Sequence, residues 1–229
     1  MALSLVFAFL YPERRDADLL VAEDGQLVAL VDHRLVTSNR VRPPDFIYNQ
    51  WRRALLLPEH QGPILLPDPN VVPKDKDGRR LMLTKGQIDA AETRMREVLN
   101  SGVDDQFSCV KSSWCIVRSS RGPVIATVEN PAYAGPACDL AAIVIVARRL
   151  GYNTCRSGAL LITSETLRRT GALEIDFGER SAASSMTVRA AMVGSDRPWN
   201  RHRRYDWRSG GETDGIPDAL LEKISGNGG

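Results

Sequence analysis

The stretch that decides the fold is AAIVIVARRLGYNTCRSGALLI, residues 141–162, in which two apolar runs flank a polar loop. Short, near-continuous apolar runs are typical of strands buried on both faces of a sheet in a layered α/β protein. Functional side chains tend to lie on the loops that follow such strands. The stretch therefore predicts two core strands, and it makes the loop that carries Arg148, Arg149 and Arg156 a candidate site.

Local patterns predict the elements around this stretch. Alternating apolar segments around Asp24 and Gly25 predict a β-hairpin near residues 18–31. An apolar stripe predicts a helix that Asp45 caps and that ends before Pro58, and Thr84 has capping-box spacing ahead of a second helix that ends at Gly102. Further segments are expected as a short helix capped by Ser164 and closed by Gly171, and as strands at residues 107–110, 114–117, 124–128, 172–177 and 185–192.

These elements predict an α/β fold, a small β-rich sandwich flanked by two or three helices. Residues 58–83 are rich in proline and charge and are expected as a loop insert within a single domain at residues 13–199. Residues 200–229 are expected as a basic-aromatic arm and a flexible tail. The residues predicted to be buried are Leu20, Val28, Trp51, Met95, Ile143, Val144, Ile145, Leu160, Leu161 and Ile175.

The total charge does not indicate a function. Of the 229 residues, 43% are apolar, which is enough for a core. The net charge of +2 is too balanced to indicate by itself a protein that binds nucleic acid. At the N-terminus, residues 1–12 hold an apolar run much shorter than the roughly 20 residues that span a bilayer. That run is either a first core strand or the last turns of a membrane helix.

The four cysteines lack the close pairs of a structural zinc site. A tight hairpin would place Cys109 opposite Cys115, and parallel pairing of the two core strands would bring Cys138 near Cys155. The alternatives are two disulfides or four buried thiols.

Known catalytic patterns are absent from the sequence. His33, His60 and His202 are far apart, and there is no HExxH motif, nucleophile elbow or phosphate loop. We therefore predict no catalytic residue, no metal ligand and no cofactor, and no small-molecule substrate is evident.

The one dense basic cluster is RPWNRHRRYDWR, residues 197–208. Guanidinium groups neutralise phosphates and aromatic rings stack on unpaired bases, so this composition suits single-stranded nucleic acid. It also suits anionic lipid headgroups, or an arm that packs its tryptophans on the domain. The candidate DNA contacts here are Arg197, Trp199, Arg201, Arg203, Arg204 and Trp207.

The order of these segments resembles the C-terminal region of ComEC-type competence proteins, in the short form found in alphaproteobacteria. The resemblance rests on DADLLVAEDGQLVAL, FIYNQWRRA, the three short strands, CDLAAIVIV, CRSGALLITSETLRRTGALEI and RAAMVGSDRPW, and covers most of residues 16–199. It implies a trimmed metallo-β-lactamase-like core attached to a multi-spanning inner-membrane channel for DNA uptake in transformation. The apolar N-terminal run would then be the stump of the last membrane helix.

In longer family members this region is thought to be a metal-dependent nuclease, with a His-His-Gly-Ser loop between two apolar strands. Here that loop position reads ARRLGYNTC, so none of the family's metal ligands transfers to this chain. We therefore expect a non-catalytic domain that contacts single-stranded DNA and the channel. Two alternatives remain: a phosphodiesterase with other ligands, and a structural domain without DNA affinity.

The resemblance places the domain on the periplasmic side of the inner membrane, and cysteines that can pair suit that oxidising compartment. Arg14 and Arg15, just after the apolar run, point weakly to the cytoplasmic side instead.

Overall fold

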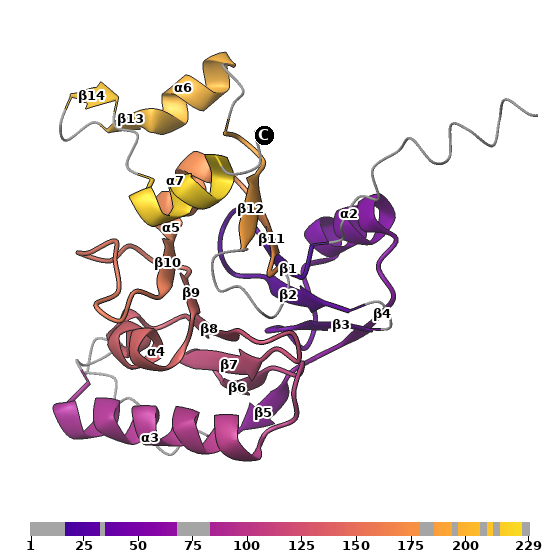
Figure 1. Ribbon diagram of the computed structural model, residues 1–229, viewed down its shortest axis with the longest axis vertical. Coiled ribbons are helices and arrows are strands. Elements are labelled where there is room, and N and C mark those ends of the chain that lie inside the picture. Colours follow the sequence, from indigo (N-terminus) through magenta and orange to yellow (C-terminus); the bar gives the residue numbers. More distant parts are fainter. Residues whose placement is uncertain are drawn as a thin grey trace, which may run out of the picture.

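Two six-stranded β-sheets form the body of the protein in this computed structural model (Figure 1). The structure describes residues 17–32, 35–67, 83–178, 186–193, 197–206, 210–212 and 216–225. The sheets pack face to face with helices outside them, which confirms the predicted α/β sandwich flanked by helices. The predicted apolar N-terminal run lies outside the described residues. No helix among the described residues combines the length and the apolar character needed to cross a bilayer.

The first sheet has the strand order β12-β11-β1-β2-β3-β4. Its neighbours are antiparallel except for β3 and β4, which are parallel. The strands are β1 (Leu19–Val21), β2 (Val28–Val31), β3 (Leu35–Ser38), β4 (Glu59–Gln61), β11 (Leu173–Asp176) and β12 (Thr187–Ala190).

The second sheet has the strand order β10-β9-β8-β7-β6-β5. Strands β8, β9 and β10 are parallel, with Ile143 of β9 opposite Ile125 on one side and Leu160 on the other. The strands are β5 (Ile64–Leu66), β6 (Ser108–Val110), β7 (Trp114–Arg118), β8 (Val124–Val128), β9 (Ile143–Val146) and β10 (Leu160–Thr163).

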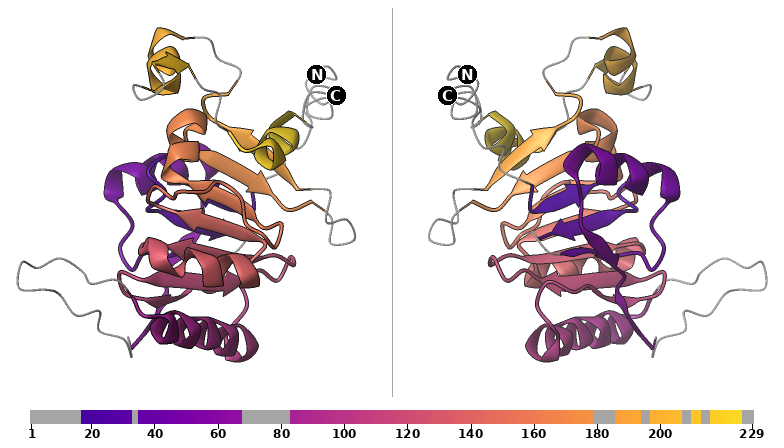
Figure 2. Two further views of the ribbon diagram at one scale, coloured as in Figure 1. Left: turned by 90° about the vertical axis from the view of Figure 1, so that its left-hand side faces the viewer. Right: turned by 90° about the vertical axis from the view of Figure 1, so that its right-hand side faces the viewer.

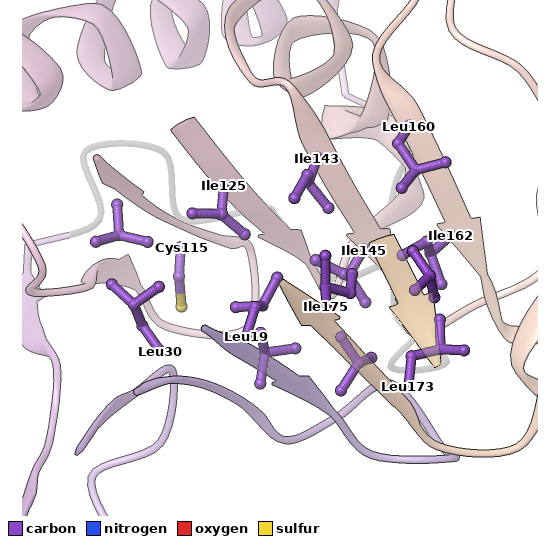
Figure 3. Packing of buried hydrophobic residues seen from close by; sticks show 14 of the residues in the cluster. Leu19, Leu30, Cys115, Ile125, Ile143, Ile145, Leu160, Ile162, Leu173 and Ile175 are labelled. Atoms are coloured by element: carbon purple, nitrogen blue, oxygen red, sulfur yellow. The ribbon is translucent and has the colours of Figure 1, made fainter. Parts of the chain in front are cut away.

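Alternation along β9 explains why its sequence is apolar throughout. Ile143 and Ile145 point into the cluster between the sheets, whereas Val144 and Val146 belong to the cluster on the outer face of the second sheet. Figure 3 shows the inter-sheet cluster, to which these isoleucines and Leu19, Leu30 and Ile175 of the first sheet belong. A strand covered on both faces needs apolar residues at every position, because both sets of side chains leave water.

Helices cover both outer faces of the sandwich, on opposite sides of the molecule in Figure 2. Helix α2 (Asp45–Leu55) lies on the first sheet and contributes Tyr48, Trp51 and Leu55 to a third cluster. Helices α3 (Lys85–Ser101) and α4 (Ala134–Leu140) cover the second sheet. A 3-10 turn (Pro131–Tyr133) leads into α4.

The remaining elements lie at one end of the sandwich. They are α5 (Ser164–Thr170), α6 (Pro198–Arg204), the small hairpin of β13 (Tyr205–Asp206) and β14 (Gly211–Glu212), and α7 (Asp218–Ser225). Leu220 of α7 is fully buried in the inter-sheet cluster. Within residues 200–229, which were expected as an arm and a flexible tail, α7 is therefore a packed helix that lies against β12.

Most sequence-predicted elements are present, with three local corrections. Residues 59–66, expected in a loop, form the edge strands β4 and β5, one in each sheet. Asp45 and Ser164 are the first helical residues rather than caps, since Pro44 and Thr163 occupy the N-cap positions. Trp51 is only partly buried, while the other residues predicted to be buried have an exposed fraction of 6% or less.

Candidate functional site

A surface cavity of about 750 Å³ lies at the carboxyl ends of β8 and β9. Glu129 and Asn130 follow β8 directly and Ala147 and Arg148 follow β9, so the parallel pairing of the two strands brings these residues together. Ligands of open α/β sheets bind at this edge, outside the carboxyl ends of the strands. The volume is in the range of small-ligand sites.

The β1–β2 turn forms another wall of the cavity through Gln26. Gly25 in this turn has a φ of +68°, and a Cβ there would lie 3.0 Å from Leu167 Cδ1 and 3.3 Å from Ala147 Cα. Only glycine combines that backbone conformation with so close an approach. The turn is therefore seated against the start of the β9–β10 loop, which places residues of both sheets around one cavity.

Arg40 is held in place at the side of the cavity. Its Nη1 lies 2.9 Å from Glu129 Oε1, and its Nε donates a hydrogen bond of 2.9 Å to the Gln26 carbonyl. Asn130 accepts a hydrogen bond from the Ala132 backbone N–H and caps the 3-10 turn. Leu83 and Ile88 supply an apolar wall.

The two neighbouring arginines of the loop differ in their partners. Arg149 donates two hydrogen bonds, of 2.9 and 2.5 Å, to Glu165 Oε2, and Arg169 binds the other oxygen of the same carboxylate at 2.9 Å. Arg148 is exposed on the rim of the cavity and has no hydrogen bond or ion pair with any described residue. Within the described part of the chain, the Arg148 guanidinium group therefore has no anionic partner.

The basic arm reaches the same edge of the sandwich. Helix α6 packs beside α5, and Arg203 pairs with Glu23 in the β1–β2 turn that also supplies Gln26 to the cavity. Arg197 is the exposed N-cap residue of α6. Trp199, Arg201 and Arg204 are in α6, but their side chains lie outside what the structure describes, and Trp207 lies outside the described residues altogether.

Arg156 does not join the other arginines. It follows Cys155, whose disulfide partner Cys138 is in α4, just before β9 begins. Ser157 also donates a hydrogen bond of 2.5 Å to the Cys138 carbonyl. These contacts hold Arg156 at the amino ends of β9 and β10, whereas Arg148 and Arg149 follow the carboxyl end of β9.

All four cysteines are in disulfides in the structure. Cys109 and Cys115 face each other across the antiparallel pair β6 and β7, with Cα atoms 4.0 Å apart. The second bond joins Cys138 to Cys155, with Cα atoms 5.5 Å apart, and fixes the far end of the β9–β10 loop to α4.

The histidines with described positions take part in other local structure. His60 of β4 has its Nε2 2.9 Å from Ser38 Oγ, and its ring lies in a T-shaped arrangement with the Tyr48 ring, with centroids 5.2 Å apart. Burial lowers the pKa of His60. His202 is exposed on α6, and His33 lies outside the described residues. Among the described residues, no three His, Cys, Asp or Glu side chains are grouped so that they could hold a metal ion.

Sequence reasoning did not predict Gln26, Arg40, Glu129 and Asn130 as part of the site. Glu129 and Asn130 carry the same signal as Arg148, since they follow an apolar strand directly, and that signal could have found them. Gln26 and Arg40 come from the other sheet, and only the packing of the sheets brings them near. Comparisons of the chain with protein-family models, with curated proteins and with solved structures find no match.

Proposed function

We propose that this chain is a non-catalytic, DNA-contacting domain of a ComEC-like inner-membrane DNA-uptake system, and that the cavity edge binds phosphates of single-stranded DNA. The observation that carries this proposal is Arg148, a guanidinium group without a described partner at the rim of a cavity. Arg148 follows β9, and β9 resembles the strand that comes directly before the metal-ligand loop in longer ComEC-type proteins. A helix-flanked sandwich is also the fold that this resemblance implies.

The surrounding ion pairs suit a phosphate ligand. Arg149 and Arg203 are paired with glutamates that are themselves partly exposed, and exposed pairs contribute only about 0 to 1 kcal/mol. A phosphate can replace the glutamate as the partner of such an arginine, because the planar guanidinium group donates hydrogen bonds to phosphate oxygens as well as to carboxylate oxygens. Arg148 would contact one phosphate of the DNA strand, and Arg149 and Arg203 would contact further phosphates of the same DNA strand.

In the proposed role, the domain binds DNA without hydrolysing it. The loop that carries ligands in the longer family members carries arginines here, and arginines can hold a phosphate but cannot activate water as a bound metal does. The two disulfides support an oxidising compartment, and hence the periplasmic side of the inner membrane.

The test is binding of the full chain to a fluorescent single-stranded oligonucleotide, followed by anisotropy across a series of salt concentrations. Binding should weaken with salt, with a log-log slope of about −0.7 for each phosphate contact, and should persist in chelator. The oligonucleotide should remain intact with Mg²⁺, Mn²⁺ or Zn²⁺. Absent or salt-independent binding would remove the DNA role, and cleavage that a chelator abolishes would favour a phosphodiesterase instead.

A further inference from the structure

The cavity at the carboxyl ends of β8 and β9 is larger than a phosphate contact requires. Its volume of about 750 Å³ is in the range that encloses a whole small molecule, whereas Arg148 alone carries the proposed phosphate contact there. Nonpolar residues line the cavity from three places: the start of α3, the 3-10 turn and the end of β9. These residues are Leu83, Ile88, Pro131, Ala132 and Ala147. The cavity therefore offers space and nonpolar surface that a phosphate does not use.

Glu129 supplies a fixed hydrogen-bond acceptor in the lining. Its Oε1 lies 2.9 Å from Arg40 Nη1, and Arg40 is itself held by its hydrogen bond to the Gln26 carbonyl. The Glu129 backbone N–H donates a hydrogen bond of 3.0 Å to the Ser113 carbonyl. No hydrogen bond among the described residues ends on Glu129 Oε2. Since an ionised carboxylate only accepts hydrogen bonds, this oxygen suits a ligand with N–H groups.

Asn130, the next residue, supplies a fixed donor in the same lining. Its Oδ1 accepts a hydrogen bond of 3.2 Å from the Ala132 backbone N–H, so this end of the amide cannot face a ligand. The Asn130 backbone N–H donates to the same Ser113 carbonyl, at 3.2 Å. No described residue accepts a hydrogen bond from Asn130 Nδ2. An acceptor and a donor are thus oriented before a ligand binds, which lowers the entropy cost of binding.

These features match the parts of a nucleotide. The faces of a nucleobase lie well against nonpolar side chains, while its edge donates and accepts hydrogen bonds. The phosphate of the same nucleotide suits Arg148, which lines the cavity as well. In single-stranded DNA the bases are already unpaired, so no base pair has to be opened before one of them enters the cavity.

The available acceptor and donor favour guanine over the other bases. Guanine carries two neighbouring donors, the N1–H group and the N2 amino group, beside the acceptor O6. The Glu129 carboxylate can accept from both donors, because each of its oxygens takes more than one hydrogen bond, and Asn130 Nδ2 can donate to O6. Adenine and cytosine place an unprotonated ring nitrogen where guanine has N1–H, and thymine has one N–H between two carbonyl groups. Each of these bases leaves a polar group of the cavity without a partner.

We propose that the cavity binds one unstacked guanine of a DNA strand whose phosphate lies on Arg148. Glu129 accepts from the guanine N1–H and N2 groups, Asn130 donates to O6, and the nonpolar lining contacts the ring. This inference rests on the proposed DNA-contacting function and adds a base preference to it. A free guanine nucleotide has the same chemistry, and the experiment separates the two sources.

The first test compares ligands on the full chain. An oligonucleotide of thymidines with one central guanine should bind about tenfold more tightly than the same strand with a central adenine. Calorimetry with the deoxynucleoside monophosphates should give the same order. Equal binding of the guanine and adenine strands overturns the guanine site but leaves the phosphate edge standing. Binding of free deoxyguanosine monophosphate without binding of any strand removes the DNA role and leaves a free-nucleotide site. Binding of neither removes both.

The second test changes the acceptor. Glu129→Gln should abolish the preference for the guanine strand over the adenine strand, because an amide cannot accept from both guanine donors with one oxygen while it keeps Arg40. The matched control is Glu97→Gln on α3, since Glu97 also pairs with an arginine, Arg94 at 3.0 Å, but does not line the cavity. The control should keep the wild-type preference. A preference that survives in Glu129→Gln contradicts the assignment.

The third test fills the cavity without changing a polar group. Ala132 is exposed, so Ala132→Leu alters no buried packing and should fold. It should reduce binding of the guanine strand to the level of the adenine strand, while an all-thymidine strand keeps its affinity and salt dependence. Ala54→Leu, at an exposed position of α2, is the control and should leave both unchanged. Full guanine preference in Ala132→Leu would show that the base lies elsewhere.

Discussion

At the scale of single residues, Asp18 is a charged group that is almost completely buried. It is 3% exposed at the start of β1, where its Oδ2 accepts a hydrogen bond of 2.7 Å from the Phe177 backbone N–H and its Oδ1 pairs with Arg121. Burial raises the pKa of Asp18 above the usual 3.8, and the nearby Asp176 carboxylate adds to the rise, although Phe177 and Arg121 oppose it. The carboxylate thus links the two sheets at the cost of its own desolvation.

A raised pKa makes stability depend on pH in a defined direction. The folded protein holds the Asp18 proton more tightly than the unfolded chain, so this contribution is fully present below pH 3.8 and is lost as pH rises through the folded-state pKa. Asp18→Asn cannot titrate and should lack this component. Urea unfolding between about pH 4 and pH 7 should show wild type losing stability relative to the variant as pH rises. A constant difference, or one of opposite sign, would contradict the assignment.

At the scale of elements, the sequence predicted best what local chemistry determines. The α3 capping box is present as expected, with the Gln87 backbone N–H donating to Thr84 Oγ1 and the Thr84 backbone N–H donating to Gln87 Oε1. The short edge strands β4 and β5 were not predicted, because three residues flanked by prolines carry no period-two pattern. Those strands exist because β3 and β6 offer them backbone partners, and such partners are not visible in local sequence.

The two disulfides provide a prediction at the same scale. In the chain-entropy model a bond stabilises more when it closes a longer loop, and the separations here are 17 residues for Cys138–Cys155 and 6 for Cys109–Cys115. Replacing both cysteines of the longer loop by alanine should cost about 3 kcal/mol, against about 2 kcal/mol for the shorter one. Denaturant unfolding of the two double variants measures this order. A larger loss for Cys109 and Cys115 would show that buried packing at β6 and β7 matters more than loop closure.

At the scale of the whole molecule, the candidate site is only partly predictable from sequence. The loop with Arg148 and Arg149 was identified because it follows a core strand, and the structure places it at a cavity. Arg156 belongs to the same loop but lies at the other end of the strands, since the parallel connection must return along the sheet. That separation depends on the direction of β10, which the apolar pattern alone does not specify.

The separation of Arg148 from Arg156 allows the most direct test of the proposal that single-stranded DNA binds at the carboxyl ends of β8 and β9. Arg148 and Arg156 are both exposed, belong to one loop and have no ion pair with a described residue, yet they lie at opposite ends of β9 and β10. The measurement is the salt dependence of single-stranded DNA binding for Arg148→Gln and Arg156→Gln. Arg148→Gln should reduce the magnitude of the log-log slope by about 0.7, and Arg156→Gln should leave it unchanged. Equal slopes for wild type and Arg148→Gln, or an equal loss in both variants, would contradict a phosphate site at the carboxyl ends of the strands.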